Sequence, residues 1–110
     1  MSNLFNVSTL PLHVNQFFYQ MATYDSYLVV ETLSTIGLPP NPAESKAVMI
    51  LNVSNHPIHI DSTDGTNMIY NNLYAPSGTS SLIVDANRIT YFIYTKNLVT
   101  NQGRWLTHLG

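Results

Sequence analysis

Six short segments from residue 47 onward constrain the fold of this chain more than any other feature. Each of them is rich in β-branched or aromatic residues. Their lengths are those of strands in globular proteins. Turn-forming residues such as Asp64-Gly65 and Asn101-Gln102-Gly103 separate them. Short strands at this spacing predict an all-β fold, a small β-sandwich or jelly-roll-like antiparallel domain. The six segments are residues 47–53, 57–61, 67–70, 81–85, 89–95 and 104–108.

A further strand and a proline-rich connection precede these segments. Residues 26–33 have the composition of a strand, and residues 37–42 read Gly-Leu-Pro-Pro-Asn-Pro. Because proline lacks an N–H group, we expect 37–42 to be a stiff connection on the surface. It is either an ordinary long loop or a hinge for an exchanged segment, and both remain open. We assign residues 25–110 to the sandwich domain.

Residues 1–24 are expected to form an extended N-terminal arm or clasp. Their apolar side chains follow no single period, apart from the alternation of Leu10, Leu12 and Val14, and residues 17–24 could form a short helix. Ordering such a segment costs conformational entropy, which only a ready-made apolar surface can offset. That surface belongs either to the chain's own sandwich or to a neighbouring subunit, and the sequence does not separate the two.

Charged residues are scarce, at 9% of the chain against about a quarter in ordinary soluble domains. Charge keeps a free protein dispersed, so we expect much of the surface to be covered by partners. The chain has only 4 Lys and Arg residues, and they are scattered. They give no electrostatic footprint for a nucleic acid or an anionic membrane, and we expect neither as a partner.

Side chains that could carry chemistry form no convincing group. His56 and His59 lie three positions apart, so on a strand they would point to opposite faces and could share an ion only across a bend at Pro57. Residues 61–67 have the Asp and Gly composition of a calcium loop but lack its spacing and terminal glutamate. The chain has no cysteine, nucleophile elbow or glycine-rich phosphate loop. We predict no metal site, no cofactor and no enzymatic activity.

The segment 89–95 is apolar on both faces. One face carries Ile89, Tyr91 and Ile93, and the other carries Phe92 and Tyr94. A strand with one solvated face should alternate more clearly, so the second face is covered either by the N-terminal segment or by another subunit. Trp105 in the last strand is expected in the core.

Part of the chain resembles a β module of tailed-phage virion proteins. The resemblance rests on residues 50–60, with Asn52-Val53-Ser54 and Ile58-His59-Ile60, and on residues 68–70, 80–84 and 103–106. It covers about half of the chain. The length, the scarcity of charge, the lack of cysteine and the apolar arm also resemble the small capsid decoration (cement or staple) proteins of epsilon15-like short-tailed phages.

This resemblance implies a structural virion protein on the outer surface of a phage capsid. It would bridge subunits of the major capsid protein, stabilise the head and associate with itself as a dimer or trimer on the lattice. The candidate protein contacts are Leu4, Phe5, Leu10, Leu12, Phe17, Phe18 and Tyr19 in the arm, and Phe92 and Tyr94 on a docking strand.

Two other classes of function fit the sequence. A tail-fibre or baseplate module would bind a host-surface glycan, through Tyr70, Tyr74 and the pair Asn71-Asn72. A host-encoded β-sandwich scaffold subunit fits the composition equally well.

Overall fold

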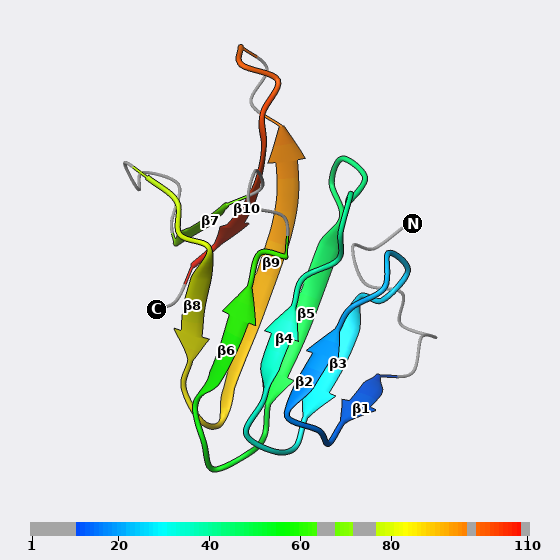
Figure 1. Ribbon diagram of the computed structural model, residues 1–110, viewed down its shortest axis with the longest axis vertical. Helices are drawn as coiled ribbons and strands as arrows, with labels where there is room; N and C mark the ends of the chain where they lie inside the picture. The colour runs from blue at the N-terminus through cyan, green and yellow to red at the C-terminus, as the bar shows by residue number, and fades with distance from the viewer. Residues whose placement is uncertain (1–10, 64–67, 72–76, 97–98, 109–110) are drawn as a thin grey trace.

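The chain folds as an all-β sandwich of two packed sheets, as predicted. The computed structural model describes residues 11–63, 68–71, 77–96 and 99–108, which contain ten strands and no helix (Figure 1). Sheet A has the order β1 (Leu12–Val14), β3 (Tyr27–Val30), β5 (Ala47–Asn52), β9 (Arg88–Lys96), β10 (Gly103–Thr107) and β7 (Ile69–Asn71). Sheet B has the order β2 (Phe18–Gln20), β4 (Thr35–Gly37), β6 (Ile58–Asp61) and β8 (Ser81–Val84).

The chain crosses between the sheets after almost every strand, which makes both sheets mixed instead of antiparallel. The pairs β1–β2, β3–β4 and β5–β6 each place one strand in sheet A and the next in sheet B. The neighbours β1, β3 and β5 of sheet A are parallel, and so are the neighbours β2, β4 and β6 of sheet B. The reason is that the chain returns to its starting direction each time it crosses to sheet B and back. The pair β8–β9 runs the other way and is antiparallel to β6 and β5.

The core lies between the sheets and is filled by alternate residues of each strand. Phe92 and Trp105 are fully buried, and the Trp105 ring meets Tyr94 edge-on at 5.4 Å between centroids. The prediction that Trp105 belongs to the core is confirmed. Gly103 lies beside the Tyr94 ring, where a β-carbon would collide with the hydroxyl group. Burial of each large apolar side chain contributes about 1.5–3 kcal/mol. Sheet B contributes Ile36, Ile58, Ile60 and Val84.

A buried asparagine ties two turns together at one end of the sandwich. Asn52 Nδ2 donates to the carbonyl oxygens of His56 at 2.8 Å, Val84 at 3.2 Å and Asp85 at 3.1 Å. Its Oδ1 accepts from the N–H of Ser54 at 3.1 Å and from the Ser54 hydroxyl at 2.7 Å. The β5–β6 turn and the β8–β9 turn are therefore held by one side chain.

Residues 11–24 of the N-terminal segment pack on the chain's own sandwich, one of the two surfaces considered above, and the proline-rich connection is partly buried. Residues 11–24 contain β1 and β2, which pair with β3 and β4 of the same chain, and residues 18–20 are a strand instead of part of a helix. Residues 1–10 of the predicted arm lie outside the described residues. The connection 37–42 begins inside the fold: Gly37 ends β4, while Leu38 and Pro39 are buried. Leu38 fills the space between the sheets, and its N–H donates to the backbone carbonyl oxygen of Asp61 at 2.9 Å.

Candidate docking surface

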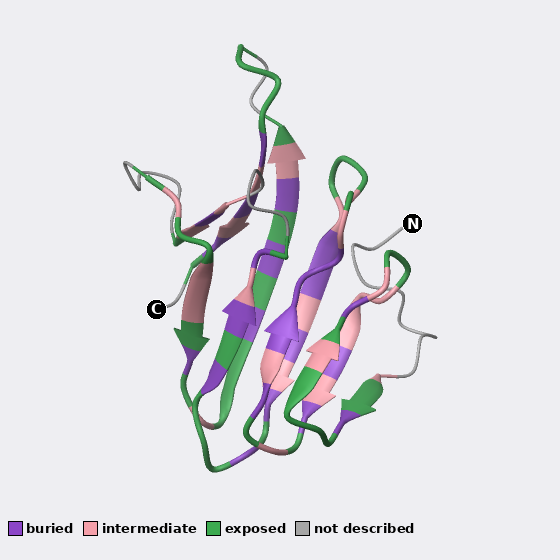
Figure 2. Cartoon of the chain, viewed as in Figure 1, coloured by how far each residue is buried: buried purple, intermediate pink, exposed green. Residues whose placement is uncertain are grey.

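Strand β9 turns one apolar face to the core and the other outward. Phe92 and Tyr94, predicted as a docking face, are 0% and 4% exposed and belong to the core. The opposite face is the exposed one, with Ile89 at 57%, Tyr91 at 50% and Ile93 at 37%. The alternation is visible along β9 in Figure 2. A docking surface on this strand must therefore consist of Ile89, Tyr91 and Ile93.

The strand register extends this outer face into rows of apolar side chains across sheet A. Ile89 lies opposite Leu51, which lies beside Val29. In the next row Tyr91 lies opposite Met49, which lies beside Tyr27. The third row runs from Ile93 through Leu106 to Tyr70. Apart from the three residues of β9, these side chains are half-buried, and none is charged.

Charged groups lie at the margins of this surface. At the β1 edge, His13 Nδ1 lies 3.1 Å from Glu31 Oε2. On the other side, the Arg104 guanidinium lies over the Tyr70 ring, 5.5 Å from its centroid. An uncharged centre with a polar margin is the usual composition of a protein–protein interface. We call the three rows, from Tyr27 and Val29 across to Leu106 and Tyr70, the apolar outer face of sheet A.

The outer face of sheet B has the opposite character. Its middle strands present Thr35, His59 and Asp61, and Gln20 lies over Gly37. Large exposed apolar side chains appear here at the two edge strands, as Phe18 on β2 and Ile83 on β8. Sheet B therefore suits contact with water, whereas sheet A suits contact with another protein.

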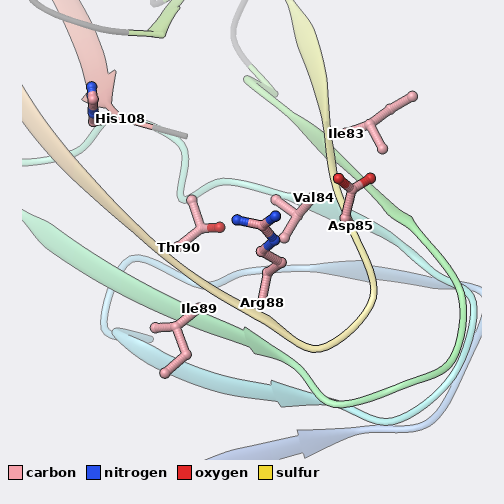
Figure 3. Close-up of a pocket in the computed structure, with 7 residues that line it drawn as sticks. All are labelled: Ile83, Val84, Asp85, Arg88, Ile89, Thr90 and His108. Atoms are coloured by element: carbon pink, nitrogen blue, oxygen red, sulfur yellow. The ribbon is translucent and has the colours of Figure 1, made fainter. Parts of the chain in front are cut away.

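Two small pockets lie on the part of the chain that the structure describes. One lies where the β8–β9 turn approaches the end of β10 and has a volume of about 100 Å³ (Figure 3). Asp85, Arg88 and His108 supply its charged or ionisable groups. Sites for small-molecule ligands usually measure about 300–1,000 Å³, so this pocket has room for little more than water.

Among the described residues, those weighed as metal ligands do not form a cluster. His59 projects from the outer face of sheet B, and His56 lies in the preceding turn. Within the part of the chain that the structure describes, no group of three or more His, Asp or Glu side chains is arranged to hold an ion. Asp64 lies outside the described residues.

The predicted arm contacts fall into three groups. Leu4, Phe5 and Leu10 lie outside the described residues. Leu12, Phe17 and Phe18 are exposed, at 40%, 79% and 56%. Tyr19 is half-buried, and its hydroxyl donates to Asp25 Oδ2 at 2.6 Å. Desolvation, followed by this hydrogen bond to the carboxylate, raises the pKa of Tyr19 to about 12.

Of the residues named for glycan binding, Asn72 and Tyr74 lie outside the described residues. Tyr70 and Asn71 are in β7, at the edge of sheet A, and Tyr70 lines a hollow of about 260 Å³ with Met68, Gln102 and Arg104.

Sequence reasoning missed Met49, Leu51 and Leu106 as surface residues. Their signal was the unbroken apolar run of residues 47–51 and the adjacent pair Trp105-Leu106, because apolar residues at successive strand positions point to both faces of a sheet. Placing Met49, Leu51 and Leu106 on the same sheet face also requires knowing which strands pair.

Comparisons of the chain with protein-family models, with curated proteins and with solved structures find no match. None of the described segments forms a helix with the length and hydropathy needed to span a membrane.

Proposed function

We propose that this chain is a structural virion protein that decorates the outer surface of a phage capsid, where it bridges subunits of the major capsid protein. The observation that supports the proposal is the apolar outer face of sheet A, opposed by a polar outer face on sheet B. A decoration protein needs this asymmetry, because one face meets the capsid and the other meets water. The partner is expected from the resemblance described above.

The composition of the apolar outer face suits attachment to a protein. Tyr27, Tyr70 and Tyr91 provide large, rigid side chains of the type that dominates binding energy in interfaces. The three rows carry no charge that would have to be desolvated on docking.

The test is binding to expanded, empty phage heads that lack this chain. Wild type should co-sediment saturably and raise the temperature at which the heads break. The variant Ile89→Ser/Tyr91→Ser should stay folded but bind at least tenfold more weakly, since a loss of about 1.4 kcal/mol corresponds to tenfold. The control Ile83→Ser removes an exposed apolar side chain from sheet B and should bind like wild type. Equal loss in both variants, or no binding by folded wild type, would reject the proposal.

The tail-fibre alternative depends on a different part of the molecule. It would use the hollow beside Tyr70 and Arg104, and it requires measurable affinity for a saccharide. Saccharide binding that Tyr70→Ala removes, together with failure to bind heads, would favour the alternative.

A further inference from the structure

The two lateral ends of the sandwich, where the edge strands of both sheets lie, differ in their hydrogen bonding. At one end, Ile69 of β7 and Thr79, just before β8, exchange two backbone hydrogen bonds of 2.8 Å, which join the margins of sheets A and B. At the other end lie β1 and β2, the edge strands of the two sheets. Among the described residues, β1 and β2 each have a neighbouring strand on one side, β3 and β4 respectively, and none on the other side (Figure 1).

The hydrogen bonds from β1 to β3 and from β2 to β4 show which backbone groups of β1 and β2 point away from these neighbours. The carbonyl oxygen of Val14 accepts from the N–H of Glu31, so the N–H and C=O of the preceding His13 point away from β3. On β2, the carbonyl oxygen of Phe17 accepts from Thr35 and the N–H of Met21 donates to Gly37. The backbone groups of Phe18 and Gln20 therefore also point away from the sheet.

Side chains at this end leave the core incompletely covered. Leu12 is in register with Leu28 on the inner side of sheet A, yet Leu12 is 40% exposed and Leu28 is 0% exposed. Phe17, just before β2, and Phe18, on the outer side of β2, are exposed as well. β1 and β2 contain no Lys, Arg, Asp, Glu or Pro, the residues with which natural edge strands usually prevent pairing.

We propose that a second copy of this chain joins here, with β1 pairing antiparallel to β1 of the partner and β2 to β2 of the partner. A twofold axis perpendicular to the sheets relates β1 to β1 of the second copy and β2 to β2 of the second copy. A single twofold rotation therefore forms both strand pairs. Both sheets then continue across the dimer, which covers Leu12 between the sheets and brings a cross-strand neighbour to Phe18.

A second copy fits this end better than a bound peptide. The occupant must present two strand edges at once, separated by the spacing of packed sheets, about 10 Å. A single extended peptide pairs with one edge and leaves the other unpaired. The same chain carries two edges at the required spacing. This inference concerns a surface distinct from the apolar outer face of sheet A and does not depend on the identity of the partner there.

Sedimentation velocity over a range of concentrations up to about 1 mM tests the proposal. Wild type should shift from monomer to dimer as concentration rises. His13→Pro/Phe18→Lys should remain monomeric, since it removes an outward N–H and adds an edge charge while the backbone hydrogen bonds of β1 to β3 and of β2 to β4 remain; of the side-chain contacts it removes the one between His13 and Glu31. The control Ile83→Lys adds the same charge to the edge strand β8 and should dimerise like wild type. A monomeric wild type, or a dimer that the edge variant leaves intact, would overturn the proposal.

Amide hydrogen exchange of wild type gives a readout that needs no variant. The amides of His13, Phe18 and Gln20 should exchange more slowly at high concentration than at low concentration, in step with the dimer fraction. Fast exchange at every concentration would contradict pairing. Protection that is independent of concentration would show that the edge is covered within the chain, which also contradicts the proposal. Neither result depends on capsid binding, so this test and the head-binding test can fail separately.

Discussion

At the scale of single residues, Asn52 stabilises the core although its side chain is polar. It is 1% exposed, and its amide satisfies backbone groups from two turns far apart in sequence. We predict that Asn52→Ala lowers the free energy of unfolding by about 2–4 kcal/mol, because buried carbonyl groups lose their donor. Urea unfolding measures this, and Asn55→Ala in the same turn, where the side chain is exposed, should change little. Equal stability of the two variants would contradict the role assigned to Asn52.

Tyr19 gives a prediction for alkaline pH. Its pKa in the folded chain is about 12, above the usual 10.0, because burial and the bond to Asp25 favour the protonated hydroxyl. This contribution to stability is complete below pH 10 and is lost as pH rises toward 12. Urea unfolding at pH 8 and pH 11 should therefore show a smaller loss of stability for Tyr19→Phe than for wild type. An identical loss in both would show that Tyr19 titrates normally.

At the scale of elements, β9 combines a core face and a surface face of nearly equal hydrophobicity. We predict that Phe92→Ala lowers the free energy of unfolding by about 3–5 kcal/mol, since it opens a cavity between the sheets. Tyr91→Ser, one position away, should cost less than about 1 kcal/mol. Chemical denaturation of the two variants distinguishes the faces. A larger cost for Tyr91→Ser would invert the assignment.

The same strand shows where sequence reasoning stops. β-branched and aromatic segments bounded by turn residues were sufficient to predict the all-β class and most strands. The face that β9 turns inward could not be predicted, because both faces are apolar and the choice is made by its long-range partners. Ile50 of β5 lies opposite Thr90, and Trp105 of β10 lies opposite Tyr94, which fixes Phe92 and Tyr94 in the core.

At the scale of the whole molecule, the sequence did not indicate the mixed sheets. The parallel pairing follows from the way in which the chain crosses between the two sheets after β1, β3 and β5. The local amino-acid composition does not indicate these crossings. Residues 18–20 lacked a clear period because β2 is a three-residue edge strand with little alternation to show. The two faces of the sandwich, one apolar and one polar, became visible only once the register was known.

The orientation of the chain on its partner tests this two-faced description most directly. A photoreactive phenylalanine analogue would replace Tyr91 on sheet A in one variant and His59 on sheet B in another, and each would be irradiated on expanded heads. We predict that position 91 cross-links to the major capsid protein and position 59 does not. Cross-linking from position 59 with none from position 91 would contradict the assignment of the apolar outer face of sheet A as the attachment surface.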